Sequence, residues 1–358
     1  MSDFHWKQKF LAIAPKPFAF LSMIGSIWII KSIYTKRRDM GVYQRILLGL
    51  STWDIMMSCA VFMGTWPIPK GSPGIFMASG TDATCSAQGF FIQMSVGTAL
   101  YNAMLSVYYV LVINLGWKEY QVKRVEPILH LVPAGFSFAS AVAVAAMDQY
   151  ANSILWCFIT PANNSLRMGV FYGPIWAALA TATISMVAIC GSHILQERKT
   201  RKYMASSRVS RQESMVSQPE SSGSAQRRRS STTQSSSQKV VSQAVFYVLS
   251  FYLTWIFPSW TRVSQMVHGS TPFFSIALFT IFCPCQGLFN CMVYFRPRVI
   301  KYRERHPEVN ILQAIHRSVI CNAQRTDNAS SRISNVKRNS NGSTVQRGGS
   351  TITNESAV

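Results

Sequence analysis

Charged residues are scarce in this 358-residue chain, where they make up 14% of the sequence. An average soluble domain has about 25%. Acidic residues are the rarer kind, with 14 Asp and Glu beside 35 Lys and Arg, which gives a formal net charge of +21. Charge is nearly absent from long apolar blocks and is concentrated in the gaps between them and at the end of the chain. This blockwise pattern is typical of a membrane protein.

Other absences argue against whole classes of function. The basic residues show neither zinc-finger spacing nor an aromatic RNA-binding signature, so the high pI does not indicate nucleic-acid binding. The last apolar block, Pro272 to Phe295, contains no lysine that could form a Schiff base with retinal. The histidines are scattered rather than clustered with Asp, which argues against a membrane-embedded hydrolase. We therefore expect no enzyme activity, no cofactor and no metal site.

The apolar blocks have the length of membrane spans. A helix needs about 20 mostly apolar residues to cross the hydrocarbon core, and internal Pro and Gly are tolerated there. The blocks run over Pro17–Tyr34, Arg45–Trp66, Cys85–Trp117, Pro127–Met147, Met168–Leu195, Val240–Val267 and Pro272–Phe295. The sequence therefore predicts an all-α membrane protein, a bundle of seven transmembrane helices.

The distribution of Lys and Arg predicts the orientation. Cytoplasmic loops carry an excess of these residues, and an extracellular amino terminus places the basic runs 36–38, 227–229 and 296–305 inside. We expect residues 1–16 to be an extracellular N-terminus and 17–305 the seven-transmembrane domain. Within it, the Ser-, Gln- and Arg-rich segment 196–239 would be a disordered third cytoplasmic loop, and 306–358 a disordered cytoplasmic tail. The basic loops would meet anionic lipid of the plasma membrane.

Two features fall on the predicted outer side. Cys85 begins the third helix and Cys157 lies in the second outer loop, both in an oxidising compartment. We predict a disulfide between them that pins this loop over the bundle; the alternative is two free thiols. Asn163 begins a glycosylation sequon in the same loop.

Polar side chains form a stripe along the third helix, with Gln88, Ser95 and Asn102 on one face. The sixth and seventh helices carry similar stripes. Such faces look into protein or water, although helix-to-helix hydrogen bonding is an alternative role. Residues near the outer ends are the ligand-pocket candidates: Gln88, Ser95, Tyr172, Trp255, Arg262 and Arg167.

Asp54 is the acidic residue that lies deep in a predicted helix, and an intramembrane carboxylate is a functional candidate. With Asn290 and Asn102 as partners, it could bind a cation, switch by protonation or tie helices together. Trp255 and Pro258 suggest a kinked hinge in the sixth helix. The predicted switch residues are Asp54, Asn102, Trp255, Pro258, Asn290 and Tyr294.

The inner segments contain candidate phosphorylation sites. Ser231 follows Arg228-Arg229-Ser230, and Ser340 follows Lys337-Arg338-Asn339. A serine shortly after a basic pair suits basophilic kinases, and phosphate would reverse the local charge.

Four motifs resemble those of G-protein-coupled receptors. They are Cys85-Ser-Ala-Gln-Gly-Phe90, Gln286-Gly-Leu-Phe-Asn290-Cys-Met-Val-Tyr294, Leu50-Ser-Thr-Trp-Asp54 and Pro174. Within that superfamily the chain resembles the slime-mould cyclic-AMP receptor group and related protist receptors, with partial rhodopsin-like motifs. Where rhodopsin-like receptors have Asp-Arg-Tyr, it reads Tyr109-Val110-Leu111.

The resemblance implies a cell-surface receptor. An unknown extracellular ligand would shift the bundle between two states, and the inner loops would signal that shift to a heterotrimeric G protein. The alternative is a small membrane transporter, which would need more buried charge than Asp54 alone. The sequence leaves the ligand open.

Overall fold

The computed structural model describes residues 2–35, 40–214 and 223–321. Within these residues it contains seven helical segments that are long and apolar enough to cross a membrane. The predicted all-α, seven-helix architecture is therefore confirmed. The chain divides into two units, Met1–Tyr294 and Phe295–Val358, and the first unit contains the helix bundle up to the middle of the seventh span.

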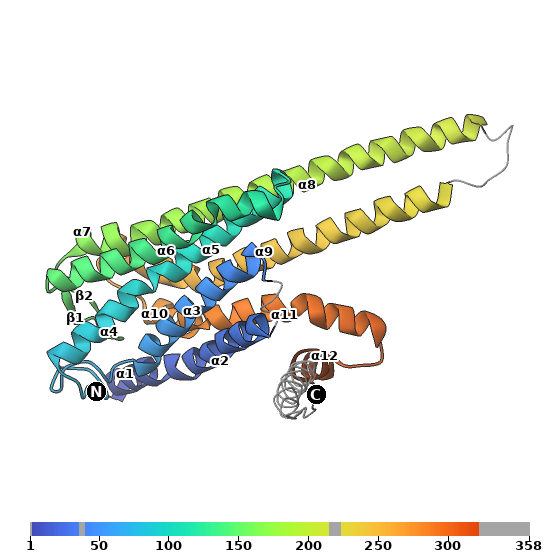
Figure 1. Ribbon diagram of the computed structural model, residues 1–358. Coiled ribbons are helices and arrows are strands. Elements are labelled where there is room, and N and C mark those ends of the chain that lie inside the picture. The colour runs from blue at the N-terminus through green and yellow to red at the C-terminus, as the bar shows by residue number, and fades with distance from the viewer. Residues whose placement is uncertain (1, 36–39, 215–222, 322–358) are drawn as a thin grey trace, which may run out of the picture. The chain divides into compact units, whose positions relative to one another are not determined.

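Figure 1 labels the helices in chain order. They are α1 (Ser2–Ile13), α2 (Pro15–Tyr34), α3 (Val42–Met63), α4 (Asp82–Met94), α5 (Val96–Tyr109), η2 (Val110–Asn114), α6 (Glu119–Ala146), α7 (Asn164–Arg167), η3 (Met168–Tyr172), α8 (Gly173–Ser214), α9 (Gly223–His268), α10 (Phe273–Phe282), η4 (Cys283–Cys285), α11 (Gln286–Arg305), α12 (Ile311–Ile315) and η5 (His316–Cys321). Two short strands, β1 (Tyr150–Asn152) and β2 (Cys157–Ile159), form an antiparallel hairpin between α6 and α7.

Several spans are interrupted, and each interruption has a local cause. The third span changes from α4 to α5 at Ser95, whose hydroxyl donates to the Ile92 carbonyl at 2.6 Å. In the seventh span Pro284 lacks an N–H donor, and the helix tightens to the 3₁₀ segment η4 around it. The fifth span passes through the π-helical segment η3 before α8. These breaks lie where the helices approach the cavity described below.

The ends of the fourth and first spans differ from the predicted bounds. α6 begins at Glu119 rather than Pro127, because Gln121 Oε1 accepts from the Lys118 N–H at 2.9 Å and caps the helix earlier. α1 already precedes α2 within residues 1–16, the predicted extracellular N-terminus. The side of the membrane on which each end lies stays a prediction.

The helices also enter the two segments that composition predicts to be disordered. α8 continues to Ser214 and α9 begins at Gly223, both inside 196–239. α12 and η5 lie inside 306–358. Helices with little apolar surface to pack are only marginally stable by themselves, so the disorder of both segments stays a prediction.

The bundle packs closely on the inside and exposes apolar side chains on the outside. A Cβ on Gly97 of α5 would lie 2.0 Å from Trp53 Nε1 of α3, so this contact requires glycine. Leu131, Ile184 and Val187 project outward with about two thirds of their surface exposed (70%, 69% and 68%). Outward-facing apolar residues of this kind suit a lipid environment, and the chain is a multi-pass membrane protein.

Candidate functional site

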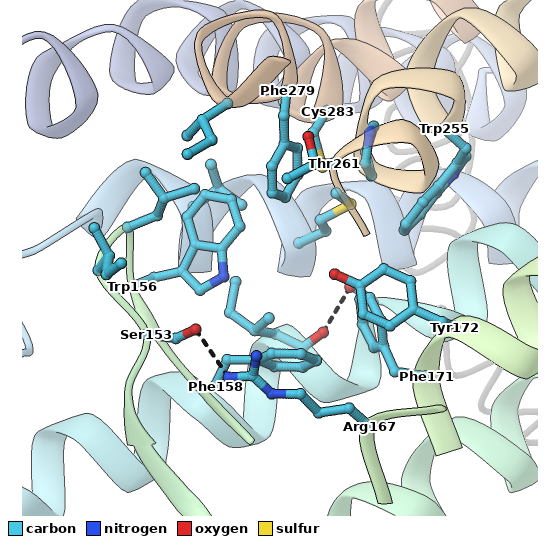
Figure 2. Close-up of a pocket in the computed structure, with 18 of the residues that line it drawn as sticks. Ser153, Trp156, Phe158, Arg167, Phe171, Tyr172, Trp255, Thr261, Phe279 and Cys283 are labelled. Carbon is cyan, nitrogen blue, oxygen red and sulfur yellow. Dashed lines mark hydrogen bonds between the residues drawn. The ribbon is translucent and has the colours of Figure 1, made fainter. Parts of the chain in front are cut away.

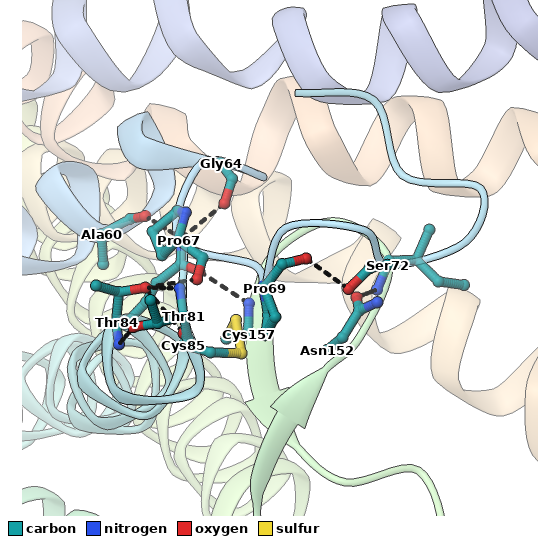
Figure 3. The surroundings of a disulfide bond; sticks show 12 residues. Ala60, Gly64, Pro67, Pro69, Ser72, Thr81, Thr84, Cys85, Asn152 and Cys157 are labelled. Carbon is teal, nitrogen blue, oxygen red and sulfur yellow. Dashed lines mark hydrogen bonds between the residues drawn. A yellow bond between two sulfur atoms is a disulfide. The ribbon is translucent and has the colours of Figure 1, made fainter. Parts of the chain in front are cut away.

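The β-hairpin is attached to the start of the third span by a disulfide. Cys85 at the beginning of α4 and Cys157 in β2 are bonded with an S–S distance of 2.01 Å, as Figure 3 shows. Both residues are buried, against Ile68 of the loop between α3 and α4. The predicted pairing is confirmed, and it fixes the hairpin at this end of the bundle.

Gln88, one turn after Cys85, serves this anchor rather than the cavity. Its Nε2 donates to the carbonyls of Ala60 at 3.0 Å and Gly64 at 2.8 Å, and its Oε1 accepts from the Cys157 N–H at 2.9 Å. Gln88 does not line the cavity that the described residues form. Its buried amide instead ties α3, α4 and the hairpin together through backbone groups.

Tyr150 adds a second attachment of the hairpin. Its ring lies against Gly89 of α4, where a Cβ would be 2.5 Å from the ring. The hydroxyl donates to the Ala141 carbonyl of α6 at 2.9 Å. Burial raises the pKa of Tyr150, so the group remains a donor over the whole neutral range.

A cavity of about 100 Å³ lies beneath the hairpin, shown in Figure 2. Its walls are mostly apolar and aromatic and come from α3, α4, the hairpin, α7, η3, α9, α10 and η4. The lining residues are Met57, Val61, Ile92, Ser95, Ser153, Ile154, Leu155, Trp156, Phe158, Arg167, Phe171, Tyr172, Trp255, Pro258, Thr261, Gln265, Ile276, Phe279 and Cys283. Four of the six pocket candidates, Ser95, Tyr172, Trp255 and Arg167, are among them.

Arg167 of α7 holds the edge of the hairpin. Its Nε donates to the Ile159 carbonyl at 2.7 Å, its Nη2 donates to the same carbonyl, and Nη2 also reaches Ser153 Oγ at 3.0 Å. The guanidinium lies 5.3 Å from the centre of the Phe158 ring. Figure 2 shows this group next to Phe158 and Ser153. The side chain is 8% exposed, so its positive charge is buried in the cavity wall.

Arg262 of α9 lies close behind the same wall. It does not line the cavity itself, but its guanidinium stands 5.1 Å from the centre of the Tyr172 ring and its Nη1 donates to Gln265 Oε1 at 3.2 Å. Tyr172 and Gln265 both line the cavity. Arg262 is 5% exposed, and its Nε and Nη2 have no hydrogen-bond partner in the described part of the chain.

Trp255 of α9 forms part of the cavity wall. It is 2% exposed, its ring centroid lies 6.2 Å from that of Phe171, and Pro258 lines the cavity one turn further along α9. Its indole N–H has no partner among the described residues. Trp255 and Pro258, the predicted hinge residues of the sixth helix, therefore both line the cavity.

Asp54 lies buried near the middle of α3, with 1% of its surface exposed. Asn290 Nδ2 donates to its Oδ2 at 2.8 Å, and Gln286 Nε2 donates to Asn290 Oδ1 at 3.2 Å. The predicted partnership with Asn290 thus corresponds to a contact between α3 and α11. Asn102, the other expected partner, donates to the Thr98 carbonyl of its own helix at 2.9 Å.

A cluster of tyrosines closes the opposite end of the bundle. Tyr43 lies in the first turn of α3, 21 residues before Gly64, which follows the end of that helix; this separation is about 30 Å along a helix. Gln243 Nε2 of α9 donates to the Tyr43 hydroxyl at 2.8 Å, and that hydroxyl donates to Tyr247 Oη at 3.2 Å. The Tyr109 ring lies 6.1 Å from Tyr43 and 6.5 Å from Tyr247. We call Tyr43, Tyr109, Gln243 and Tyr247 the inner cluster.

The sequence prediction missed two contacts of α3 near Tyr43, the hydrogen bonds of Tyr43 itself and an ion pair of Arg45. Tyr43 lies outside the predicted second span, so nothing marked it as a partner of the polar stripe on the sixth helix. Arg45 of α3 forms an ion pair with Glu126 of α6, with Nη2 to Oε2 at 2.8 Å. The sequence signal that could have indicated this ion pair is the presence of opposite charges at corresponding ends of two spans.

Tyr294 is a predicted switch residue, and its hydroxyl oxygen lies 3.4 Å from Ser32 Oγ of α2.

The predicted modification sites fall in three different situations. Asn163 caps α7, with Oδ1 accepting from the Leu166 N–H at 3.1 Å and Nδ2 donating to Gln149 Oε1 at 3.3 Å. The backbone at Ser231 belongs to α9, but its side chain lies outside the described residues, as does Ser340 altogether. All three modifications stay predictions.

Comparison with known proteins identifies a similar fold but no matching family. No family model matches the sequence, and no curated protein matches it. Among solved structures, the chain is similar to squid rhodopsin with a TM-score of 0.62 at 14% sequence identity, over 88% of this chain and 85% of that one. At this identity the likeness concerns the fold alone, so the chain has a rhodopsin-like seven-helix fold.

Proposed function

We propose that this protein is a receptor of the plasma membrane that binds a ligand in the cavity under the hairpin and signals to a heterotrimeric G protein. The observation that carries the proposal is the path of α9. Trp255 of this helix lines the cavity, and Gln243 and Tyr247 of the same helix belong to the inner cluster. The continuous helix α9 therefore links the two ends of the bundle.

The distances along α9 make this link physically reasonable. Tyr247 and Gln243 lie 8 and 12 residues before Trp255, which corresponds to about 12 and 18 Å of helix. A tilt of α9 at Pro258 changes the cavity wall and the hydrogen bonds of the inner cluster together. A ligand with different affinities for the two arrangements shifts their populations, which is what a receptor requires.

The inner side also suits a G-protein partner that docks against a lipid surface. The inner ends of the helices carry the basic runs of the sequence, which attract anionic lipid. Opening of the inner cluster would expose the end of α5 and the part of α9 around Gln243 and Tyr247. Tyr109, at the position where rhodopsin-like receptors have a motif of opposite charges, makes ring contacts here instead.

Reconstitution tests the proposal against the transporter alternative. The purified protein in lipid nanodiscs should form a complex with a nucleotide-free G-protein heterotrimer of the source organism, detected by size exclusion, and added GTP should dissociate it. A mock-treated nanodisc is the control. Absence of a complex, combined with solute flux into liposomes that contain the protein, would favour the transporter.

A further inference from the structure

The cavity has two unlike walls, and together they indicate which class of ligand it takes. This inference rests on the proposed function, in which the cavity is the ligand site. One wall is aromatic, formed by Trp156, Phe279 and Trp255. The opposite side carries the Arg167 guanidinium, with Arg262 behind Tyr172.

Arg262 is the key residue because its charge is buried without compensation. Its Nε and Nη2 atoms make no hydrogen bond, and no salt bridge joins it to an acidic group among the described residues. A buried cation in this state is unfavourable and is usually paired with an anion. Its neighbours Tyr172 and Gln265 line the cavity, so the unpaired charge stands one side chain away from the empty space.

Arg167 adds a second positive charge at the same wall. Its donors are engaged with the Ile159 carbonyl and with Ser153, which are neutral groups. These hydrogen bonds fix the side chain but leave its charge uncompensated. Asp and Glu are absent from the described lining of the cavity, so the protein itself supplies no counterion there.

The remaining walls set the rest of the ligand. Rings of Trp156 and Phe279 lie edge to face with centroids 5.4 Å apart, and Figure 2 shows both beside the cavity. Aromatic walls of this kind bury a flat apolar group favourably. The cavity of about 100 Å³ is smaller than an apolar cavity of ~150 Å³ that binds benzene, so it limits the apolar body of the ligand to one ring at most.

We propose that the cavity binds a small organic anion, with an apolar or aromatic body between Trp156, Phe279 and Trp255 and a carboxylate or phosphate facing Arg167 and Arg262. The acid group supplies the missing negative charge beside both guanidinium groups, and it reaches the open Nε and Nη2 donors of Arg262 when the Tyr172 side chain that separates them from the cavity moves aside. A neutral or cationic analogue of the same shape leaves that charge unpaired and binds more weakly.

Thermal unfolding of the purified protein, without any G protein, tests this ligand class. The probes are benzoate, phenylacetate, 3-phenylpropionate and phenyl phosphate, each compared with a neutral analogue (the carboxamide, or the phenyl alcohol) and the matching amine. The protein is held in nanodiscs of zwitterionic lipid, so that the lipid supplies no net anionic headgroup. Arg262→Gln and Arg262→Lys are compared with Arg124→Gln, a change at an exposed arginine of α6.

At least one acid should raise the unfolding temperature and bind roughly tenfold tighter than its neutral analogue, as expected for a charge-assisted hydrogen bond. Arg262→Gln should remove this preference, Arg262→Lys should keep part of it, and Arg124→Gln should keep all of it. The wild-type comparison of acid and neutral analogue stands even if Arg262→Gln does not fold.

Equal binding of acids and neutral analogues, or an acid preference that survives Arg262→Gln, would overturn the proposal. So would a rise in unfolding temperature that depends on Arg262 but occurs only in nanodiscs containing phosphatidylglycerol, because it would assign the charge to a lipid headgroup. Acid binding without any G-protein complex would instead reject the receptor function and leave the anion site standing.

Discussion

The inner cluster makes the sharpest single-residue prediction, at Tyr43. The change Tyr43→Phe removes the hydroxyl that accepts from Gln243 at 2.8 Å and donates to Tyr247 at 3.2 Å. The ring remains, so its contacts with Tyr108 and Tyr109 at 6.0 and 6.1 Å are kept. The variant should therefore fold while the hydrogen bonds between α3 and α9 are lost.

The size of the effect follows from the two hydrogen bonds. Each contributes a net stabilisation of about 0.5–1.5 kcal/mol, so their loss weakens the closed arrangement by about 1–3 kcal/mol. If the open arrangement does not contain these bonds, the equilibrium moves toward it by a factor of about 5–150. A state populated at ~1% would then reach roughly 5% or more.

The assay is ligand-free nucleotide exchange on a purified G protein, with wild type and variant in matched nanodiscs. Tyr43→Phe should raise the basal exchange rate several-fold. Tyr120→Phe is the control, because Tyr120 is an exposed tyrosine of α6. A folded Tyr43→Phe variant whose basal rate equals that of the wild type would refute the argument that the inner cluster holds the closed state.

Two further predictions concern stability and use thermal unfolding. Gly97→Ala should destabilise the protein by about 1–3 kcal/mol, because the new Cβ would lie 2.0 Å from Trp53 Nε1. Gly169→Ala is the control and should be neutral, because no packing neighbour lies within 4 Å of the added Cβ. Equal effects of the two changes on the unfolding temperature would contradict the packing argument. Replacing Cys85 and Cys157 by Ser should lower the unfolding temperature. The loop-closure entropy for a separation of 72 residues limits the loss of unfolding free energy to about 4 kcal/mol. An unchanged unfolding temperature would refute the stabilising role of the disulfide.

The sequence predicted those features of the fold that depend on residue type and spacing. The membrane spans follow from apolar length, and the pairing of Cys85 with Cys157 follows from two cysteines on one side of the membrane. The contact of Asp54 with Asn290 follows from the need of a buried carboxylate for a polar partner in an apolar bundle. In each of these three cases one physical requirement leaves few possible arrangements or partners for the residues involved.

The parts that escaped prediction depend on how helices meet in three dimensions. Tyr43 and Tyr247 are 204 positions apart, and no periodicity within either helix indicates that their hydroxyls touch. Gln88 resembled a ligand contact because it shares the polar face of the third helix, yet three backbone groups use its amide. Arg262, a predicted pocket residue, stands behind the cavity wall, and the lack of a hydrogen-bond partner for its Nε and Nη2 becomes visible only in the packed structure.

The most direct test of the receptor account is nucleotide exchange on a purified heterotrimeric G protein, measured with wild type and Asp54→Asn in the same nanodiscs. The account predicts that the wild type accelerates exchange over the G protein alone. It also predicts that Asp54→Asn, which keeps an acceptor for the Asn290 amide at this buried position, folds but changes that acceleration. Unchanged acceleration would remove Asp54 from the switch. No acceleration by the wild type, together with solute flux in liposomes, would contradict the receptor function itself.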